Sequence, residues 1–322
     1  MKSAILNFPE QFGFTPKIEN KTAFKKADKF IILGMGGSHL AADIIAAFRP
    51  EKNIIIHSDY GLPLLPEKKL KDYLLIASSY SGNTEEVLDG LNQALNKGLN
   101  VACAAVGGKL LETARERKLP FVEIPNTGIQ PRAALGVSLR ALAKIMGDEE
   151  ILRDTSELEK TLEPKKLEEK GKELAGEIKN KMPIIYTSRK NAFIGYNWKI
   201  KMNETGKIPA FVNIFPELNH NEMTSFDIAD STRKLSQNFY FIFLKDDKYD
   251  HPKIVKRMEI TAGLYRKRGL PVKTIELSGL NHFHKIFSSL LFADWTAFYT
   301  AKRYGLEAEQ VPMVEEFKKL IK

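Results

Sequence analysis

The sequence predicts an α/β protein in which two doubly wound domains, each built on a parallel sheet, follow one another along the chain. Two observations support this prediction. Short apolar runs alternate with longer stretches that have a helical spacing of apolar residues, which is typical of βαβ units. This alternation occurs twice, and a segment rich in Glu and Lys, residues 148–181, lies between the two series. We therefore expect domains at residues 1–150 and 151–322, which a diverged duplication would explain.

The first series starts after residues 1–28, which predict an irregular or helical lead-in. Its first strand ends in a glycine-rich turn, and a helix follows with apolar residues from Leu40 to Phe48. Pro131 suits the first turn of the last helix in this series. The expected strands are Phe30–Leu33, Asn53–Ile56, Tyr73–Ala77, Val101–Val106 and Phe121–Ile124, and further helices are expected at 84–97, 109–117 and 131–146.

The second series follows residues 148–181, where leucines at helical spacing among charged residues predict one or two surface helices that link the domains. Apolar runs then alternate with helical stretches once more. The expected strands are Pro183–Ser188, Phe239–Leu244 and Val272–Leu277, and helices are expected at 192–203, 251–267, 285–304 and 311–321.

The composition limits the classes of function. The chain has 322 residues, a formal net charge of +9 and 43% hydrophobic residues, which is enough for a substantial core in each domain. Its lysines are scattered among acids, so a surface that attracts small anions explains the charge, and we expect no nucleic-acid partner. Cys103 is the only cysteine and lies in an apolar run, which excludes an intramolecular disulfide. Since no apolar run approaches the ~18 residues of a membrane span, we expect a cytoplasmic protein that binds no membrane.

The turn Gly34-Met35-Gly36-Gly37-Ser38 follows the first strand and has three interpretations. One is a dinucleotide site, with Asp59 at the spacing of a ribose-binding acid, but the third glycine of that motif would fall at His39. Another is a tight turn that needs the backbone freedom of glycine. In the third, the backbone N–H groups of this turn line a polar substrate pocket at the carboxyl end of the sheet.

A second polar turn, Ser78 to Val87, follows the third strand and precedes a helix. Its serines, glycine and threonine supply hydroxyls, a flexible backbone and the N–H groups of a helix start, which together suit a phosphate. The alternative is that Ser81 or Asn83 only caps the helix. Because both turns end parallel strands of one sheet, we expect them to face one pocket.

Together with three further motifs, the two turns resemble the sugar isomerase (SIS) domain, a flavodoxin-like module that binds phosphosugars. The order of the motifs is similar to that of the bifunctional phosphoglucose/phosphomannose isomerases, which carry two SIS domains in tandem. The resemblance extends from about residue 30 to the C-terminus. The motifs are Gly34-Met35-Gly36-Gly37-Ser38, Ser79-Tyr80-Ser81-Gly82-Asn83-Thr84, Gln130-Pro131-Arg132, Asn203-Glu204 and Pro216-Glu217-Leu218-Asn219-His220-Asn221-Glu222.

This resemblance implies a catalytic set and a substrate-binding set. Arg132 would face C1 and C2 of the sugar, Glu204 would be the catalytic base, and His220 would open the sugar ring. Lys318 would be a further cation of the site, although Lys319 is adjacent and Val-Glu-Glu-Phe-Lys departs from the more frequent Ile-Asp-x-Leu-Lys. The phosphate and neighbouring hydroxyls would be held by Gly37, Ser38, Ser79, Ser81 and Thr84.

These residue types suit an aldose–ketose isomerisation. One carboxylate can move a proton between C2 and C1 through a cis-enediol, and an arginine can stabilise the enediolate. An imidazole can pass the proton between O1 and O5 that ring opening requires. The resemblance implies no cofactor, no metal, and a homodimer in which His220 reaches across from the second subunit. His282 and His284 alternate without a cysteine or a paired acid, which disfavours a metal site there.

The expected reaction is the interconversion of glucose 6-phosphate and fructose 6-phosphate, with mannose 6-phosphate and fructose 6-phosphate as a further pair. For the mannose substrate, the family threonine expected near Val311 and Pro312 is not evident. The alternative function is a non-catalytic phosphosugar sensor like the SIS domains of transcription regulators, but we find no helix-turn-helix in the sequence. A third interpretation, a different phosphosugar isomerase, would need other residues in place of the Pro-Glu-Leu-Asn-His run.

Overall fold

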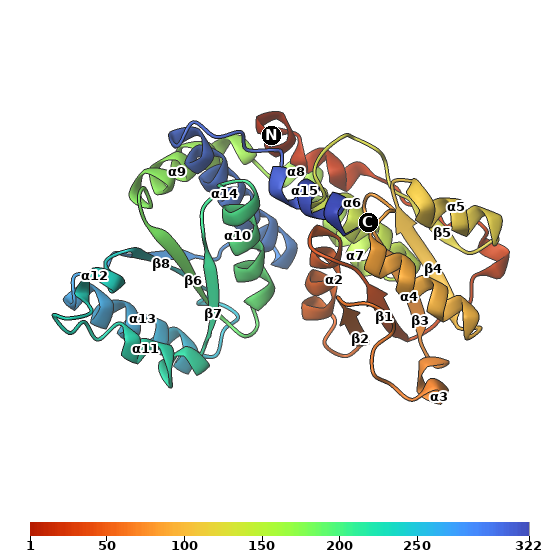
Figure 1. Ribbon diagram of the computed structural model, residues 1–322, viewed down its shortest axis with the longest axis horizontal. Coiled ribbons are helices and arrows are strands. Elements are labelled where there is room, and N and C mark those ends of the chain that lie inside the picture. Colours follow the sequence, from red (N-terminus) through yellow and green to blue (C-terminus); the bar gives the residue numbers. More distant parts are fainter. Residues whose placement is uncertain (322) are drawn as a thin grey trace. The chain divides into compact units, whose positions relative to one another are not determined.

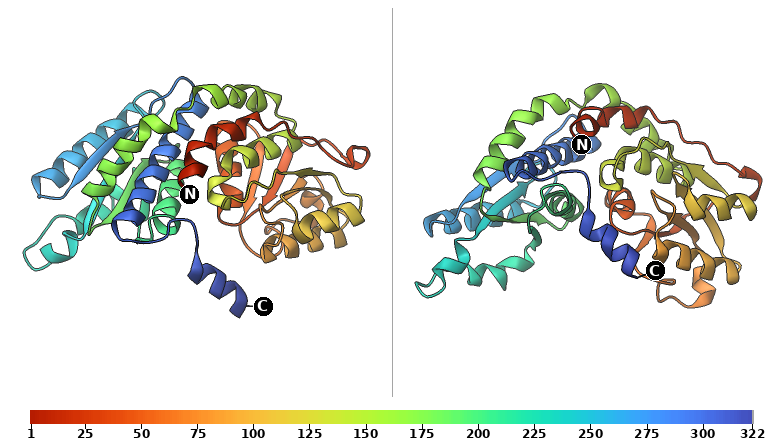
Figure 2. Two further views of the ribbon diagram at one scale, coloured as in Figure 1. Left: turned by 90° about the horizontal axis from the view of Figure 1, so that it is seen from above. Right: turned by 45° about the horizontal axis from the view of Figure 1, so that its top comes forward.

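The computed structural model describes residues 1–321, and these fold as two compact units (Figures 1 and 2). The N-terminal unit comprises Asn7–Thr161. The C-terminal unit combines Met1–Leu6 with the chain from Leu162 onward, so the polypeptide leaves this unit after six residues and later returns to it.

The N-terminal unit extends beyond residue 150. Helices α7 (Glu149–Ser156) and α8 (Leu158–Thr161) both pack against the turn η1 (Phe8–Gly13), which explains why residues 151–161 join this unit. The functional division into residues 1–150 and 151–322 stays a prediction.

The N-terminal unit is built on a five-stranded parallel sheet with the strand order β2-β1-β3-β4-β5. Strand β3 lies in the middle of the sheet and is buried along its whole length, as helices on both faces of a parallel sheet require. Each strand lies within one residue of the bounds expected from the sequence, which confirms the first series. The strands are β1 (Lys29–Leu33), β2 (Asn53–His57), β3 (Leu74–Ser78), β4 (Asn100–Ala105) and β5 (Phe121–Glu123).

Helices cover this sheet and complete its hydrophobic core (Figure 1). Cys103 in β4 is fully buried, and burial raises the pKa of its thiol to about 12, so the thiol stays neutral.

The expected helix from Pro131 begins as the 3-10 turn η3 (Pro131–Ala133), and the α-helix starts only after it. The helical elements are η2 (Lys21–Ala23), α2 (Gly37–Phe48), α3 (Glu67–Leu70), α4 (Glu85–Asn96), α5 (Gly108–Glu116) and α6 (Leu135–Ile145).

The C-terminal unit has a four-stranded parallel sheet with the order β7-β6-β8-β9. Three of its strands agree with the sequence prediction: β6 (Met182–Ser188), β8 (Phe239–Lys245) and β9 (Val272–Glu276). The fourth, β7 (Phe211–Phe215), is absent from the prediction. It is an edge strand in which Asn213 interrupts the apolar run and Phe211 is 48% exposed, so the continuous apolar pattern of a buried strand is missing.

One helix of this unit, α9 (Pro164–Glu177), packs more closely than the sequence predicts. The charged segment 148–181 contains three helices, and the last of them, α9, packs along α14. A Cβ on Gly171 of α9 would overlap the side chain of Trp295 of α14, which shows how closely the two helices approach. The elements are α1 (Lys2–Leu6), α9 (Pro164–Glu177), α10 (Ala192–Glu204), η4 (Glu217–Asn219), α11 (Glu222–Ser225), α12 (Arg233–Ser236), α13 (Pro252–Lys267), α14 (His282–Arg303) and α15 (Pro312–Leu320).

No helix within residues 1–321 combines the length and the apolar character that crossing a bilayer needs.

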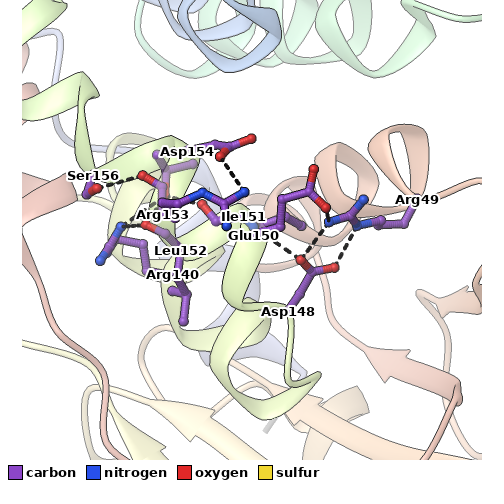
Figure 3. A network of polar contacts seen from close by, with 10 residues as sticks. Arg49, Arg140, Asp148, Glu150, Ile151, Leu152, Arg153, Asp154 and Ser156 are labelled. Carbon is purple, nitrogen blue, oxygen red and sulfur yellow. Dashed lines mark hydrogen bonds and ion pairs between the residues drawn. The ribbon is translucent and has the colours of Figure 1, made fainter.

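A buried ion pair joins the end of α2 to the start of α7 in the N-terminal unit (Figure 3). The guanidinium group of Arg49 donates to both carboxylate oxygens of Asp148, at 2.7 and 2.9 Å. Asp148 is also the N-cap of α7 and accepts the N–H of Ile151 at 3.1 Å. Burial by itself would raise the pKa of Asp148, but the hydrogen bonds from Arg49 and Ile151 outweigh it and lower the pKa to about 2.

The charge of Asp148 should therefore stabilise the folded protein. Replacing Asp148 by Asn keeps a good N-cap but removes the charge, and we expect a loss of about 2 kcal/mol at pH 7. Because the folded pKa lies below the unfolded one, the loss should be fully present above pH ~4 and should vanish as the pH falls towards 2. Urea unfolding at both pH values measures it.

The surface pair of Arg153 and Asp154, drawn in the same figure, provides the control, because the two side chains are 71% and 34% exposed. Asp154→Asn should change the unfolding free energy by no more than about 0.5 kcal/mol. Equal effects of both substitutions would contradict the role assigned to the buried pair.

Candidate active site

The carboxyl ends of β1 and β3 meet at the switch point of the N-terminal sheet. After β1 the chain continues through α2 to β2 on one side, whereas β3 lies on the other side of β1. In open α/β sheets, ligands bind at this point because the loops after the two strands diverge. Residues 34–38 follow β1 and residues 79–84 follow β3, so both polar turns lie at the same edge, as the sequence predicts.

Ser38 ties the two turns together. Its hydroxyl oxygen accepts a hydrogen bond from the backbone N–H of Tyr80 (2.9 Å), and its carbonyl oxygen accepts one from the hydroxyl of Ser78 (3.3 Å). Ser38 is only 7% exposed. The turn before it needs glycine, because Gly36 has a φ of +50°. The turn is therefore tight, and it also holds a polar side chain at the switch point.

Ser79 and Thr84 close the second turn on itself. Their side-chain oxygens are 2.8 Å apart, and the N–H of Gly82 donates to the hydroxyl of Ser79 (3.1 Å). Ser79 is 1% exposed, so its hydroxyl shapes the loop from the inside. Ser81 is exposed and Thr84 is half-buried, and these two side chains are the more accessible to a ligand.

Neither Ser81 nor Asn83 caps helix α4. The N-cap residue is Thr84, and its side chain makes no capping hydrogen bond within the described chain. The side chain of Asn83 instead accepts a hydrogen bond from the N–H of Lys109 in α5 (3.1 Å), and Ser81 accepts one from the N–H of Asn83 (3.3 Å). The capping alternative is therefore wrong, because both side chains bond within the loop or across to the next one.

Close backbone contacts fix the position of both turns. A Cβ on Gly37 would lie 2.8 Å from the backbone nitrogen of Arg132, so α2 begins directly against η3. Gly82 has a φ of +71°, and a Cβ there would overlap the carbonyl oxygen of Gly107. Arg132 itself is 2% exposed. The structure thus gathers six of the predicted site residues in the N-terminal unit, namely Gly37, Ser38, Ser79, Ser81, Thr84 and Arg132.

Glu204 belongs to the C-terminal unit, where it is the last residue of α10 and is half-buried. The ammonium group of Lys207 donates to the carbonyl oxygens of both Glu204 and Gln310. Lys207 therefore connects the end of α10 to the segment that leads into α15. The predicted base and the helix that carries the predicted lysine are linked in this way within one unit.

Lys318 lies on α15 and forms an ion pair with Glu315 (2.8 Å). None of the residues Pro312–Leu320 is buried, and Phe317 is 58% exposed. Lys319 is exposed as well, so exposure to solvent does not distinguish the two lysines. The choice of Lys318 stays a prediction.

His220 is exposed on the loop that follows β7, directly after η4. Because β6 and β7 are parallel, α10 must run back along the sheet before β7 begins (Figure 1). Glu204 at the end of α10 therefore lies towards the amino end of β7, and His220 lies beyond its carboxyl end. The five residues of β7 span about 17 Å. Within one chain, the predicted base and the predicted ring-opening residue are at opposite ends of this strand.

Charged side chains fill the switch point of the C-terminal sheet. Asp246 follows β8 and pairs with Lys285 of α14, and these side chains are 0% and 2% exposed. The side-chain nitrogen of Asn191 lies 3.2 to 3.3 Å from oxygens of Ser188, Asp246 and Asp250. This cluster lies at the carboxyl edge of the C-terminal sheet. The corresponding edge of the N-terminal sheet carries hydroxyl groups instead. The prediction from the sequence misses it, although Asp-Asp directly after an apolar strand is a signal that could have found it.

Asp250 is the member of this cluster whose hydrogen bonding is incomplete within the described residues. Its Oδ1 accepts the hydroxyl of Ser188 (2.6 Å), but its buried Oδ2 accepts no hydrogen bond from the described residues. Burial raises the pKa of Asp250, and the hydrogen bond of Ser188 opposes the rise only in part. The ionised carboxylate therefore costs stability at neutral pH.

Asp250→Asn should stabilise the protein by about 1 kcal/mol at pH 7, because it removes the buried charge and places an amide nitrogen near the carboxylate of Asp246. The folded pKa of Asp250 is raised, so the gain should shrink as the pH falls through the acid range in which the wild-type carboxyl group becomes protonated. Urea unfolding across that range measures it. The exposed neighbour Asp247 is the control, and a gain of the same size from Asp247→Asn would contradict the explanation.

Comparisons with known proteins agree with the motifs. A family profile described as the bacterial phospho-glucose isomerase C-terminal SIS domain matches residues 167–321. A bifunctional phosphoglucose/phosphomannose isomerase of Aquifex aeolicus is 30% identical to this chain over 98% of its length and 96% of that protein. One of Caldicellulosiruptor bescii is 33% identical over 99% of this chain and 98% of that protein.

A solved structure of a hypothetical protein of Thermus thermophilus has the same fold, with a TM-score of 0.72, 16% identity, and coverage of 99% of this chain and 87% of that one. The identity of 30% and 33% to the two isomerases extends over nearly the whole chain, and this establishes the family to which the chain belongs. This chain belongs to the bifunctional phosphoglucose/phosphomannose isomerase family.

Proposed function

We propose that this protein is an aldose–ketose isomerase that interconverts glucose 6-phosphate and fructose 6-phosphate, and also mannose 6-phosphate and fructose 6-phosphate. Membership of the family supports the proposal. The structural observation that carries it is the hydrogen bond between Ser38 and Tyr80, which joins the two polar turns at one switch point. A phosphosugar can contact both turns only if they are held together in this way.

The phosphate binds at the second turn. Ser81 and Thr84 offer accessible hydroxyls, and the N–H groups at the start of α4 add the positive end of a helix dipole. Ser79 contributes from inside by keeping Thr84 and Gly82 in place. The net charge of +9 favours the approach of a phosphorylated substrate.

Glu204 transfers the proton and Arg132 stabilises the intermediate. The carboxylate takes a proton from C2 of the aldose and returns it to C1, so that one group serves both carbons of the cis-enediol. A buried guanidinium group suits the enediolate because it carries its charge without taking part in the proton transfer, and Arg132 is 2% exposed. Neither step needs a cofactor.

The protein acts as a homodimer in the cytoplasm. His220 and Glu204 lie at opposite ends of β7 in one chain, so a site that uses both takes His220 from a second copy. His220 is exposed at the tip of its loop, where such a contact can form. Lys318 is the further cation of this site.

Assays of the purified protein with each sugar phosphate test the proposal. An isomerase converts glucose 6-phosphate to fructose 6-phosphate, whereas a sensor binds the sugar without turnover. Binding without turnover of any of the three hexose phosphates would overturn the proposal in favour of the sensor.

Glu204→Gln should lower kcat by a factor of about 10² to 10⁴ and leave the binding of fructose 6-phosphate nearly unchanged, because only the proton acceptor is lost. Coupled rate assays and calorimetric titration measure the two effects. Glu173→Gln changes an exposed glutamate of the same unit and should leave kcat as it is. Near-normal turnover by Glu204→Gln would identify another base.

Thr84→Ala should raise KM by up to about tenfold with little change in kcat, since it removes one hydroxyl from the phosphate and its partner Ser79 keeps the bond to Gly82. Steady-state kinetics separate the two constants. An exposed threonine of η2, Thr22, serves as the control. An unchanged KM in Thr84→Ala would remove this turn from the phosphate site.

A further inference from the structure

The loop that carries His220 is held on both sides of the histidine. On one side, the side-chain nitrogen of Asn219 donates to the hydroxyl of Thr261 in α13 (2.9 Å), and its oxygen accepts from Arg257 (3.3 Å). On the other side, Glu222 begins the short helix α11. His220 is thus the exposed point between two fixed residues.

The second of these, Glu222, is connected to the hydrophobic core. Its Oε1 accepts the hydroxyl of Tyr186 (2.6 Å), and its Oε2 accepts the side-chain nitrogen of Asn213 in β7. Tyr186 is 0% exposed and packs against the rings of Phe215 and Phe243. A glutamate two residues after the exposed histidine is therefore bound to a tyrosine that cannot move without disturbing the core.

The directions of these hydrogen bonds can be assigned. Both oxygens of Glu222 accept hydrogen bonds. Burial raises the pKa of this carboxyl group, and the hydrogen bonds from Tyr186 and Asn213 oppose the rise. Tyr186 gives its hydrogen to Glu222, so the hydroxyl of Tyr265, at 3.3 Å from that of Tyr186, must be the donor in that contact. Two buried tyrosines and one glutamate form a chain that ends at the loop of His220.

We propose that Glu222 is the positioning residue of His220, and that it acts through its hydrogen bond to Tyr186. The inference rests on the proposed function, in which His220 opens the sugar ring. Ring opening moves a proton between the anomeric hydroxyl and O5, that is, between O1 and O5 in glucose 6-phosphate and between O2 and O5 in fructose 6-phosphate. The imidazole must therefore be held within hydrogen-bond reach of both oxygens. An exposed loop without this connection would present His220 in many orientations, and ring opening would slow.

Three variants separate this role from others. Tyr186→Phe keeps the packing of the ring and removes only the hydroxyl, and Glu222→Ala removes the connection altogether. Glu222→Gln keeps an oxygen for Tyr186, and Asn213 can turn its amide to accept from the new nitrogen. We expect turnover of cyclic fructose 6-phosphate to fall about 10- to 100-fold in the first two variants and to be largely retained in Glu222→Gln.

The decisive measurement compares two substrates. Fructose 6-phosphate is mostly cyclic, whereas 5-deoxyfructose 6-phosphate lacks the oxygen that closes the ring and is always open. NMR follows the isomerisation of both without coupling enzymes. A variant that misplaces His220 should lose turnover of the cyclic substrate and retain turnover of the open one, as His220→Ala itself should.

Tyr240→Phe is the matched control. Tyr240 also donates its hydroxyl to a glutamate, Glu177, in the same unit, but this pair is remote in sequence from the loop of His220. Its loss should affect neither substrate. The comparison therefore removes the general cost of losing a half-buried tyrosine–glutamate hydrogen bond.

The outcomes are distinct. Selective loss of the cyclic substrate in Tyr186→Phe and Glu222→Ala, with rescue by Glu222→Gln, supports the positioning role. Equal loss of both substrates, or equal loss in Glu222→Ala and Glu222→Gln, overturns it, because the first indicates general damage and the second a direct proton transfer by Glu222. If the wild type isomerises neither substrate, or His220→Ala loses both, the proposed function or its assignment of His220 fails instead.

Discussion

The direction of the strands is the constraint that decides where most of the predicted site residues lie. In each sheet all paired strands are parallel. A residue that follows a strand therefore lies at the carboxyl edge of the sheet, and a residue that ends the next helix lies at the amino edge. Ser79 and His220 follow strands, whereas Glu204 ends a helix. Within one chain, Glu204 and His220 therefore lie at opposite edges of the C-terminal sheet.

Both sheets have a switch point where the strand order reverses, but different side chains lie at the two switch points. In the N-terminal unit the edge carries hydroxyls and glycine turns, which suit a ligand. In the C-terminal unit the ion pair of Asp246 and Lys285 fills the corresponding place. A buried ion pair adds little net stability, because desolvation offsets most of the attraction, but removing one partner leaves an unpaired charge. In the C-terminal unit, the carboxyl edge of the sheet is therefore filled by side chains that hold the fold together, whereas the N-terminal edge carries hydroxyl groups.

The sequence predicts the strands well where the apolar run is unbroken. The strands β1 to β5 are placed within one residue, and this includes the edge strands β2 and β5, because each has a short continuous apolar run between polar residues or turns. Edge strand β7 is missed because its apolar pattern is interrupted at Asn213, and the charged segment 148–181 conceals how closely α9 approaches α14 at Gly171.

The candidate site can be predicted in its residue types but not in its hydrogen bonds. Motif spacing places Ser79, Ser81 and Thr84 in one turn, yet only the structure shows that Ser79 faces inward and that Asn83 bonds to Lys109 instead of capping α4. These hydrogen bonds depend on side-chain rotamers and on contacts between loops, which motif spacing in the sequence does not predict. The connection from Tyr186 to Glu222 has the same origin.

The position of α1 has a consequence for how the chain is made. Lys2–Leu6 packs on α9 and α14, and the ammonium group of Met1 contacts Glu309 at 2.6 Å. This segment precedes Asn7–Thr161 in the sequence but belongs to the unit whose other residues follow them. Asn7–Thr161 can fold around its own sheet before α9 and α14 are synthesised. Ile5 is 2% exposed in the finished protein, but it cannot be buried until those two helices are present.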